Sequence, residues 1–324
     1  MTDFCYNFTY QNNLENHVII LGDRYSFTDL EKEQLQRMFD HIAHVSYKEK
    51  SVDTVIDAIE EVLERAPRLI VLNTRAPLPN ELIAYLTRKE LDGIAYLTIE
   101  HFLETYLHKC FIPEDHTDLS YLENIRPYGR WQYAQKRAVD FFGIFWLFFF
   151  SWPVMLYAAW RIKKESPDGP VLFRQKRVGK NGREFVCLKF RSMVPDAEKG
   201  KPQFASKDDP RIFKWGATMR KTRIDELPQM WNILKGEMHL IGPRPERKYW
   251  TDQFEKTIPY YNERHLVAPG VTGWAQVMYP YGTHHEDAKQ KLMYDFYYIK
   301  YWNIRLELKI VWKTAMTVIN KKGI

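Results

Sequence analysis

The chain has 324 residues and a formal net charge of +6, and its 45% hydrophobic and 27% charged residues exclude a disordered or collagen-like protein. The length allows about two domains of roughly 150 residues each. The mean hydropathy of −0.46 excludes a polytopic membrane protein but leaves room for one membrane-embedded element. Three distant cysteines, Cys5, Cys110 and Cys187, exclude a disulfide framework or a CxxC metal site and fit a reduced, cytosolic setting.

Charge is divided unequally along the chain. Residues 1–125 carry 22 acidic and 11 basic side chains, whereas residues 126–324 carry 19 acidic and 36 basic ones. A basic second half indicates an anionic partner such as nucleic acid, lipid headgroups or a phosphorylated substrate. The alternative is that these lysines and arginines only keep the surface soluble.

Apolar runs alternate with amphipathic stretches over residues 1–111. We expect strands over 17–21, 69–72 and 94–98, and helices over 30–42, 51–65, 80–89 and 99–107. This alternation predicts a small Rossmann-like α/β domain with a parallel sheet. The turn after the first strand reads GDRYSF and has no GxGxxG pattern, so a structural or regulatory role is favoured over nucleotide binding. Residues 112–131, with Pro113 and Pro127, are predicted to form a linker.

The most apolar window covers residues 139–160, which as a helix span about 33 Å, enough to cross a bilayer core. Pro153 lies inside the window and kinks a helix, and basic residues flank both ends, which favours both ends on the cytoplasmic side. We therefore expect a re-entrant helix hairpin that bends at Ser151–Pro153, with the Ser151 hydroxyl bonded to a carbonyl that the kink frees. The alternative is a buried core helix, but the many Phe and Trp residues in the window favour a membrane.

Two strand-like runs, 171–178 and 183–190, are joined by Lys180–Asn181–Gly182, which is typical of a hairpin turn. Lys189 and Arg191 are two residues apart and would lie on one face of a strand, where two cations suit a pyrophosphate. The alternative is that they solubilise an exposed strand edge.

Two adjacent carboxylates, Asp225 and Glu226, precede Pro228, which is tolerated only in the first turn of a helix. They are therefore expected at a helix N-terminus, where the dipole and nearby cations keep a carboxylate ionised. Such a carboxylate can attack phosphorus, and its neighbour can bind Mg²⁺. Simple helix capping explains the same residues. Arg244 favours chemistry, because a guanidinium between two prolines is held on a stiff backbone suited to phosphate oxygens.

A series of motifs runs in order through the second half of the chain. They are KRAVD at 136–140, Ser-x-Pro at 151–153, GPVLFRQKRVGKNGREFVCLKFRSM at 169–193, DDPR at 208–211, RKTRIDELPQMWNILKGEMHLIGPRPE at 220–246, PGVTGWAQV at 269–277 and YDFYYIKYW at 294–302. In these motifs, residues 132–324 resemble the catalytic unit of the bacterial sugar transferases, the monotopic polyprenyl-phosphate phosphoglycosyl transferases.

The resemblance implies an α-rich α+β catalytic domain over residues 132–324, monotopic in the bacterial inner (cytoplasmic) membrane and facing the cytoplasm. Asp225 matches the nucleophile that takes a phosphosugar from a UDP-sugar and releases UMP, and Glu226 matches the partner that binds Mg²⁺. Undecaprenyl phosphate would then attack the aspartyl phosphosugar intermediate and regenerate Asp225. The other matched site positions are Lys189, Arg191, Arg244 and Asp295.

By the same resemblance, the reaction is the first membrane step of exopolysaccharide, capsule or O-antigen synthesis. The implied partners are a UDP-sugar, undecaprenyl phosphate and inner-membrane lipid rather than nucleic acid, and a homodimer is left open. A rival assignment is a membrane-associated nucleotide-sugar glycosyltransferase that releases UDP, but such an enzyme often carries a DxD metal motif, and the sequence has none.

The chain departs from the family pattern after GWAQV. Many smaller members continue with Asn-Gly-Arg-Asn, whereas this chain has Met278–Tyr279–Pro280–Tyr281–Gly282, so an arginine available to the sugar nucleotide is absent. The aromatic residues around Trp274 and Tyr279 either stack on uracil or pack in the core. The identity of the sugar and the role of residues 1–125 stay open.

Overall fold

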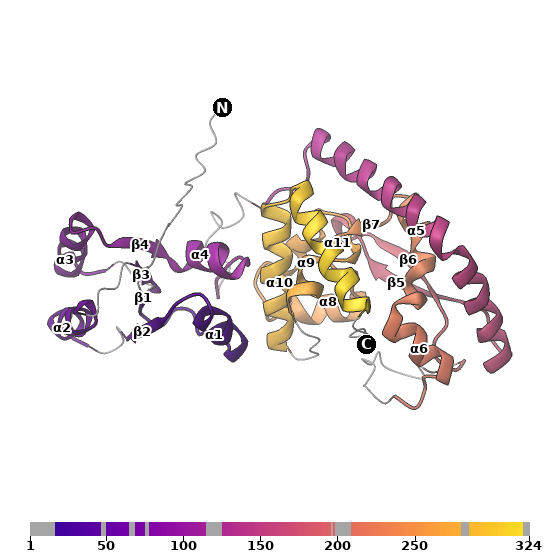
Figure 1. The fold of residues 1–324 in the computed structure, drawn as a ribbon, viewed down its shortest axis with the longest axis horizontal. Helices are drawn as coiled ribbons and strands as arrows, with labels where there is room; N and C mark the ends of the chain where they lie inside the picture. The colour runs from indigo at the N-terminus through magenta and orange to yellow at the C-terminus, as the bar shows by residue number, and fades with distance from the viewer. Residues whose placement is uncertain are drawn as a thin grey trace. The chain divides into compact units, whose positions relative to one another are not determined.

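The computed structural model describes residues 17–46, 50–64, 69–74, 78–114, 125–195, 197, 209–279 and 285–319. The chain divides into two compact units, Met1–Phe111 and Ile112–Ile324 (Figure 1). The first unit is an α/β structure with a parallel sheet and the second is mainly helical, so the coarse fold class predicted from the sequence is confirmed.

A four-stranded parallel sheet in the order β2-β1-β3-β4 forms the centre of the first unit. The apolar strands β1 and β3 are almost entirely buried, because helices cover both faces of the sheet (Figure 1). The elements are β1 (His17–Leu21), α1 (Asp29–Gln36), β2 (His41–Val45), α2 (Val52–Leu63), β3 (Leu69–Leu72), α3 (Asn80–Leu91), β4 (Ala95–Thr98), α4 (Ile99–Phe102) and η1 (Leu103–Leu107).

One expected element of this unit is wrong in part. The helix expected over residues 30–42 ends at Gln36, and residues 41–45 form β2, an edge strand paired in parallel with β1. Two histidines, His41 and His44, interrupt the apolar pattern of this strand and both are exposed. A half-exposed edge strand of five residues therefore has no clear apolar periodicity.

The carboxyl ends of β1 and β3 meet where the strand order reverses, the usual ligand crevice of such a sheet. Here the fully buried Asn73 fills this place, and its amide nitrogen donates to the carbonyls of Gly22 and Tyr25 at 3.0 and 2.9 Å. Its oxygen accepts the Tyr25 N–H at 2.7 Å. These bonds join the turns that follow β1 and β3, and the structural or regulatory role of this unit stays a prediction.

Besides the long helix α5, the second unit has six shorter α-helices, three 3₁₀ helices and four short strands in the part of the chain that the structure describes. The hairpin expected at Lys180–Gly182 is confirmed: β5 and β6 are antiparallel, and Asn181 and Gly182 have φ of 54° and 72°. The elements are α5 (Arg130–Glu165), β5 (Leu172–Val178), η3 (Lys180–Gly182), β6 (Glu184–Phe190), α6 (Lys214–Thr222), η4 (Ile224–Gln229), α7 (Met230–Leu234), β7 (His239–Ile241), α8 (Lys248–Phe254), η5 (Tyr261–Leu266), β8 (Gly270–Thr272), α9 (Trp274–Met278), α10 (His285–Lys300) and α11 (Ile304–Ile319).

The helix α5 packs one face along the second unit and exposes the rest. Ile144 joins the cluster around Ile233, and Ala158 and Ile162 pack with Phe190. By length and composition, α5 could cross a membrane, and only 17% of its most apolar 18 residues are buried. Such exposure excludes a buried core helix and favours a membrane environment. Within the apolar window 139–160, its large exposed apolar residues are Phe141, Phe142, Phe145, Trp146, Leu147, Phe148, Phe149, Phe150, Trp152, Val154, Leu156, Tyr157 and Trp160.

The structure does not confirm the re-entrant hairpin, because α5 continues through Ser151 and Pro153 as one helix. Proline removes one backbone donor, and a helix that is packed on both sides of it can continue with a kink. The expected bond from Ser151 to a freed carbonyl is wrong: its Oγ is buried and has no hydrogen-bond partner among the described residues.

Two charged residues of the KRAVD segment fasten the beginning of α5 to the second unit. Lys136 forms an ion pair with Glu307 of α11, and both side chains are fully buried. Asp140 accepts the Leu240 N–H at 2.8 Å and contacts Nδ1 of His239 at 2.6 Å. These contacts attach α5 to α11 and β7, the strand that leads into the Arg244 segment.

Candidate active site

A break between two helical segments places Asp225 and Glu226. After α6, Arg223 has a left-handed φ of 57°, and the 3₁₀ helix η4 begins at the next residue. The two carboxylate residues are 6% and 7% exposed. Arg223 takes the N-cap position and no side chain caps η4, so helix capping does not explain the acidic pair.

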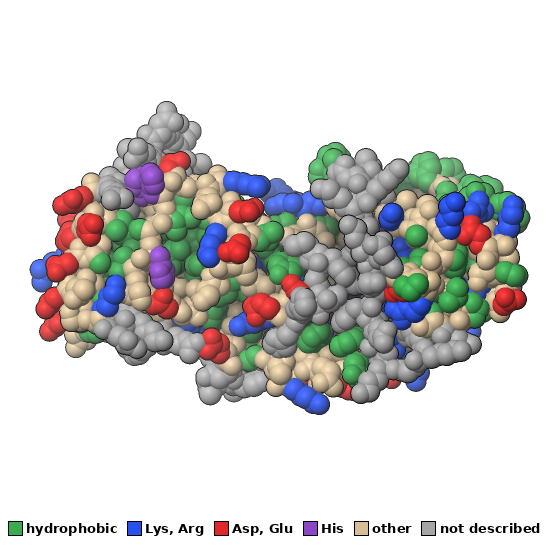
Figure 2. Space-filling view, turned by 90° about the horizontal axis from the view of Figure 1, so that it is seen from below, with side chains coloured by type: hydrophobic (Ala, Val, Ile, Leu, Met, Phe, Trp, Pro, Cys, Tyr) green, Lys and Arg blue, Asp and Glu red, His purple; other side chains and the backbone are tan. Residues whose placement is uncertain are grey.

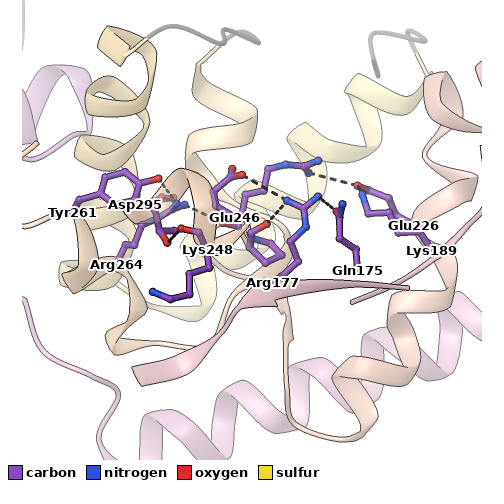
Figure 3. A network of polar contacts seen from close by, with 12 residues as sticks. Gln175, Arg177, Lys189, Glu226, Glu246, Lys248, Tyr261, Arg264 and Asp295 are labelled. Carbon is purple, nitrogen blue, oxygen red and sulfur yellow. Dashed lines mark hydrogen bonds and ion pairs between the residues drawn. The ribbon is translucent and has the colours of Figure 1, made fainter. Parts of the chain in front are cut away.

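Three cations surround Glu226. Its carboxylate lies 2.9 Å from Nζ of Lys189, which Figure 3 shows beside it. It also lies 3.4 Å from Nη1 of Arg223 and 3.5 Å from Nη1 of Arg244. Burial alone would raise the pKa of Glu226, but these cations hold it well below its ordinary value. The cations therefore favour the ionised form of Glu226, which lies at the centre of a cationic cluster.

Asp225 has a different charge state from its neighbour. Burial raises the pKa of Asp225 to about 6, against the lowering effect of Lys189, and the charge of Glu226 raises it further. The ionised state expected at a helix N-terminus thus applies to Glu226 more than to Asp225, because η4 and α7 are short and burial outweighs their dipole. Near neutral pH Asp225 is still mainly ionised, and among the residues that the structure describes its carboxylate forms no ion pair like those of Glu226.

We expect the first half of any reaction at Asp225 to slow as the pH falls through about 6, because protonation removes the nucleophilic carboxylate. The carboxylate is present above this pKa and lost below it. The measurement is a single turnover with a phosphorylated donor alone, because the phosphate of an acceptor would titrate in the same range. A rate that stays level down to about pH 5 would contradict this charge state for Asp225.

The position of Lys189 beside Glu226 depends on Asn232, a residue to which the sequence assigned no role. Asn232 of α7 is 1% exposed and lies beside β6. Its amide donates to the carbonyl of Val186 at 2.7 Å and accepts the N–H of Leu188 at 3.0 Å, as a neighbouring strand would. The amide thus fixes β6, and with it Lys189, against the segment that carries the two carboxylates.

A small pocket adjoins this cluster. Among its lining residues are Lys189, Glu226 and Arg244, together with Arg177, Cys187, Gln229, Pro245, Gly270 and Val271. Pro245 and Gly270 form part of the pocket wall, and Gly270 is closely packed, because a side chain on it would lie 2.0 Å from the nitrogen of Gly242. A pocket that places Lys189, Arg177 and Arg244 around the Glu226 carboxylate suits a phosphorylated ligand.

The acidic side chains near the pocket determine whether the protein could bind Mg²⁺. Within the described ranges, no group of three or more His, Cys, Asp and Glu side chains is arranged to hold a metal ion. Mg²⁺ in phosphoryl-transfer sites commonly takes one or two carboxylates and completes its shell with water and substrate phosphates. The adjacent Asp225 and Glu226 fit that pattern but not a cage made by the protein alone.

The family model described as bacterial sugar transferase matches residues 131–321, which is more than half of the chain. The chain belongs to this family. The match covers the apolar helix, the acidic pair and the Arg244 segment, and it agrees with the resemblance seen in the sequence motifs.

Named relatives of this sugar transferase act on polyprenyl carriers. It is 42% identical over 247 residues to a UDP-N-acetylgalactosamine-undecaprenyl-phosphate N-acetylgalactosaminephosphotransferase of Aeromonas hydrophila, covering 76% of this chain and 57% of the relative. It is 44% and 39% identical to UDP-glucose:undecaprenyl-phosphate glucose-1-phosphate transferases of Xanthomonas campestris pv. campestris and Escherichia coli, covering 53% and 56% of this chain. Those alignments cover 36% and 39% of the relatives, so the chain spans about half of their length or less.

The structure brings only some of the sequence-predicted site residues of the transferase together. Lys189 and Arg244 join the acidic pair, whereas Arg191 lies beyond the end of β6 and turns away. Arg191 donates to Oγ of Ser166 at 2.9 Å and to the carbonyl of Gly169 at 3.3 Å. The alternation of side chains that places Lys189 and Arg191 on one face holds only within a strand, and β6 ends at Phe190.

Asp295 and the aromatic residues also lie apart from the acidic pair. Asp295 of α10 is 2% exposed and pairs with Arg264 at 2.7 Å, two residues that Figure 3 shows side by side. Trp274 is 1% exposed and stacks on Tyr297, so of the two alternatives for this residue the structure favours packing. Part of the departing segment, residues 280–284, lies outside the described residues.

Proposed function

We propose that the chain transfers a phosphosugar from a UDP-sugar to undecaprenyl phosphate and releases UMP, in the first membrane step of exopolysaccharide, capsule or O-antigen synthesis. The named relatives support this reaction class. The observation that carries the proposal is the unequal acidic pair, in which three cations engage Glu226 and leave Asp225 the more nucleophilic carboxylate.

In the proposed first half-reaction, a carboxylate oxygen of Asp225 attacks the sugar-bearing phosphorus, and the bond from that phosphorus to the bridging oxygen breaks. UMP leaves with the electron pair, and an aspartyl phosphosugar intermediate remains. In the second half, the phosphate oxygen of undecaprenyl phosphate attacks the same phosphorus and releases the Asp225 carboxylate. Lys189 and Arg244 neutralise the phosphate charge during both transfers.

The proposal includes Mg²⁺, which would neutralise charge on the donor diphosphate when bound. Glu226, with Asp225 beside it, is the carboxylate that would hold it. Because Lys189 and Arg244 contact Glu226 in this structure, a bound Mg²⁺ would have to share that carboxylate with them.

We also propose that the sugar transferase is monotopic, with α5 as a re-entrant element in the inner membrane and the catalytic unit facing the cytoplasm. Straight, the 36 residues of α5 would extend about 54 Å, more than a bilayer core. Both ends of α5 contact the same unit, through Lys136 on one side of Pro153 and Ile162 on the other. Because one unit holds both ends of the helix, we infer that α5 enters and leaves the membrane on the same side.

Cysteines introduced at the exposed Ala134 and Lys164 should both react with a membrane-impermeant maleimide from the cytoplasmic side only. The test uses inverted and right-side-out vesicles from cells that produce each protein, with Cys5, Cys110 and Cys187 replaced so that only the introduced cysteine can react. Labelling of the two positions from opposite sides would replace the re-entrant element with a true crossing.

A donor panel tests the proposed reaction. Purified protein, undecaprenyl phosphate, Mg²⁺ and one of UDP-N-acetylgalactosamine, UDP-glucose or UDP-galactose should yield UMP and a polyprenyl-diphosphate sugar with at least one donor. Release of UDP instead would favour the rival glycosyltransferase, which makes a glycosidic bond without a covalent phosphosugar.

A further inference from the structure

Two arginines from different elements donate to consecutive carbonyls beside Arg244. Nη2 of Arg264, on η5, donates to the carbonyl of Arg244 at 3.1 Å. Nη1 of Arg177, on β5, donates to the carbonyl of Pro245 at 3.1 Å. Prolines at 243 and 245 lack N–H groups, so neither can hold this segment by a backbone donor. The carbonyls are held from outside by guanidinium groups instead.

Buried side chains hold Arg264 in place, and Arg264 is not among the residues that line the pocket. It is 5% exposed, pairs with Asp295 at 2.7 Å and donates to the hydroxyl of Tyr261 at 2.9 Å. It does not line the pocket beside the acidic pair, whereas Arg244 lines that pocket and its side chain is 38% exposed. Arg264 thus contacts the backbone of Arg244 on the side away from the pocket.

Arg177 is also held by neighbouring side chains, but unlike Arg264 it lines the pocket. It donates to the Gln175 side chain at 2.6 Å and lies 3.7 Å from the carboxylate of Glu246 (Figure 3). Because Arg177 also lines the pocket, its replacement would change ligand contacts directly. Arg264 is therefore the cleaner residue for a test.

We infer that Arg264, held by Asp295, is a positioning residue that fixes the backbone of Arg244 so that its guanidinium is aimed at the donor diphosphate. The inference rests on the proposed function and adds to it a role for two buried residues. Asp295 then acts through Arg264 and Arg244 rather than on the substrate or the metal. A guanidinium held in place before binding loses less entropy when it grips phosphate oxygens.

A double-mutant cycle tests the inference in the full-length protein, with UDP and Mg²⁺ as the binding probe. Arg244→Ala should weaken UDP binding about tenfold or more, the loss of a charge-assisted hydrogen bond. Arg264→Lys keeps a positive charge beside Asp295, but a lysine cannot bond to Asp295, Tyr261 and the Arg244 carbonyl in the planar geometry of a guanidinium. It should therefore weaken UDP binding about fivefold. In the Arg244→Ala background, Arg264→Lys should have no further effect.

Three results would overturn the inference: equal effects of Arg264→Lys in both backgrounds, UDP binding by Arg264→Lys at wild-type strength, or a wild-type chain that does not bind UDP. Asp295→Asn supplies a second variant with the same expected dependence on Arg244 if Arg264→Lys does not fold. Arg137→Lys is the matched control, because Arg137 also donates to two backbone carbonyls, those of Ile233 and Leu234, but lies outside the pocket. Its UDP affinity should be unchanged.

The same proteins separate this inference from the proposed function. Failure to release UMP from any UDP-sugar, with UDP still bound, would overturn the reaction and leave the Arg264–Arg244 coupling to be judged by its own cycle. Normal UMP release with additive effects of the two variants would overturn the positioning role alone.

Discussion

The Asp225→Asn protein is expected to lose UMP release by at least about 10³-fold, because an amide is a poor nucleophile toward phosphorus. Its thermal stability should equal or exceed that of the wild type. Burial raises the pKa of Asp225, so its ionised form costs folding free energy near neutral pH, and a neutral amide removes that cost. The measurement is single-turnover UMP release, with thermal unfolding of the same preparation.

Asp252→Asn is a suitable control, since Asp252 is a half-exposed partner of Lys248 on α8, outside the acidic cluster. It should retain wild-type UMP release. Full turnover by Asp225→Asn, with its mass verified to exclude deamidation back to aspartate, would remove Asp225 from the nucleophile role.

Glu307→Gln is expected to destabilise the second unit by about 3–5 kcal/mol, because it leaves Lys136 buried without its counter-ion. Glu307 also accepts hydrogen bonds at 2.7 Å from the hydroxyl of Tyr298 and the indole N–H of Trp302, which an amide oxygen can still receive. The loss therefore comes mainly from the charge. At about 2–4 °C per kcal/mol for a unit of this size, the unfolding midpoint should fall by roughly 10 °C.

The double variant Lys136→Met with Glu307→Leu is the matched comparison. It removes both charges and restores apolar packing, so it should be less destabilised than Glu307→Gln alone. A double variant as unstable as the single one would show that hydrogen bonds, and not the unpaired charge, dominate at this place.

Local patterns in the sequence predict most of the framework. The apolar runs at 17–21 and 69–72 are strands with those bounds, and Lys180–Asn181–Gly182 forms the expected turn because only such residues adopt a left-handed backbone readily. The edge strand β2 is missed because its exposed histidines hide the alternation. The continuous α5 is missed because the packing that carries a helix past Pro153 is tertiary.

In the candidate active site, too, the sequence reveals residues with an unusual local context but not those placed by tertiary contacts. Asp225, Glu226 and Arg244 are recognisable because each occurs in an unusual local context, an acidic pair before a proline and an arginine between prolines. Asn232 and Arg264 are not recognisable, because their partners lie 44 and 31 residues away in the chain and ordinary sequence spacing does not relate them. The different charge states of Asp225 and Glu226 likewise depend on burial and on Lys189, which only the folded chain brings together.

The most direct measurement of the central claim is the mass of the intact protein after rapid mixing with a UDP-sugar from the donor panel and Mg²⁺, without undecaprenyl phosphate. We predict a gain equal to one phosphosugar, located on Asp225 by peptide mapping, and its loss when undecaprenyl phosphate is added. UMP formed in the full reaction with no adduct at Asp225 under single-turnover conditions would contradict the covalent mechanism and favour direct transfer.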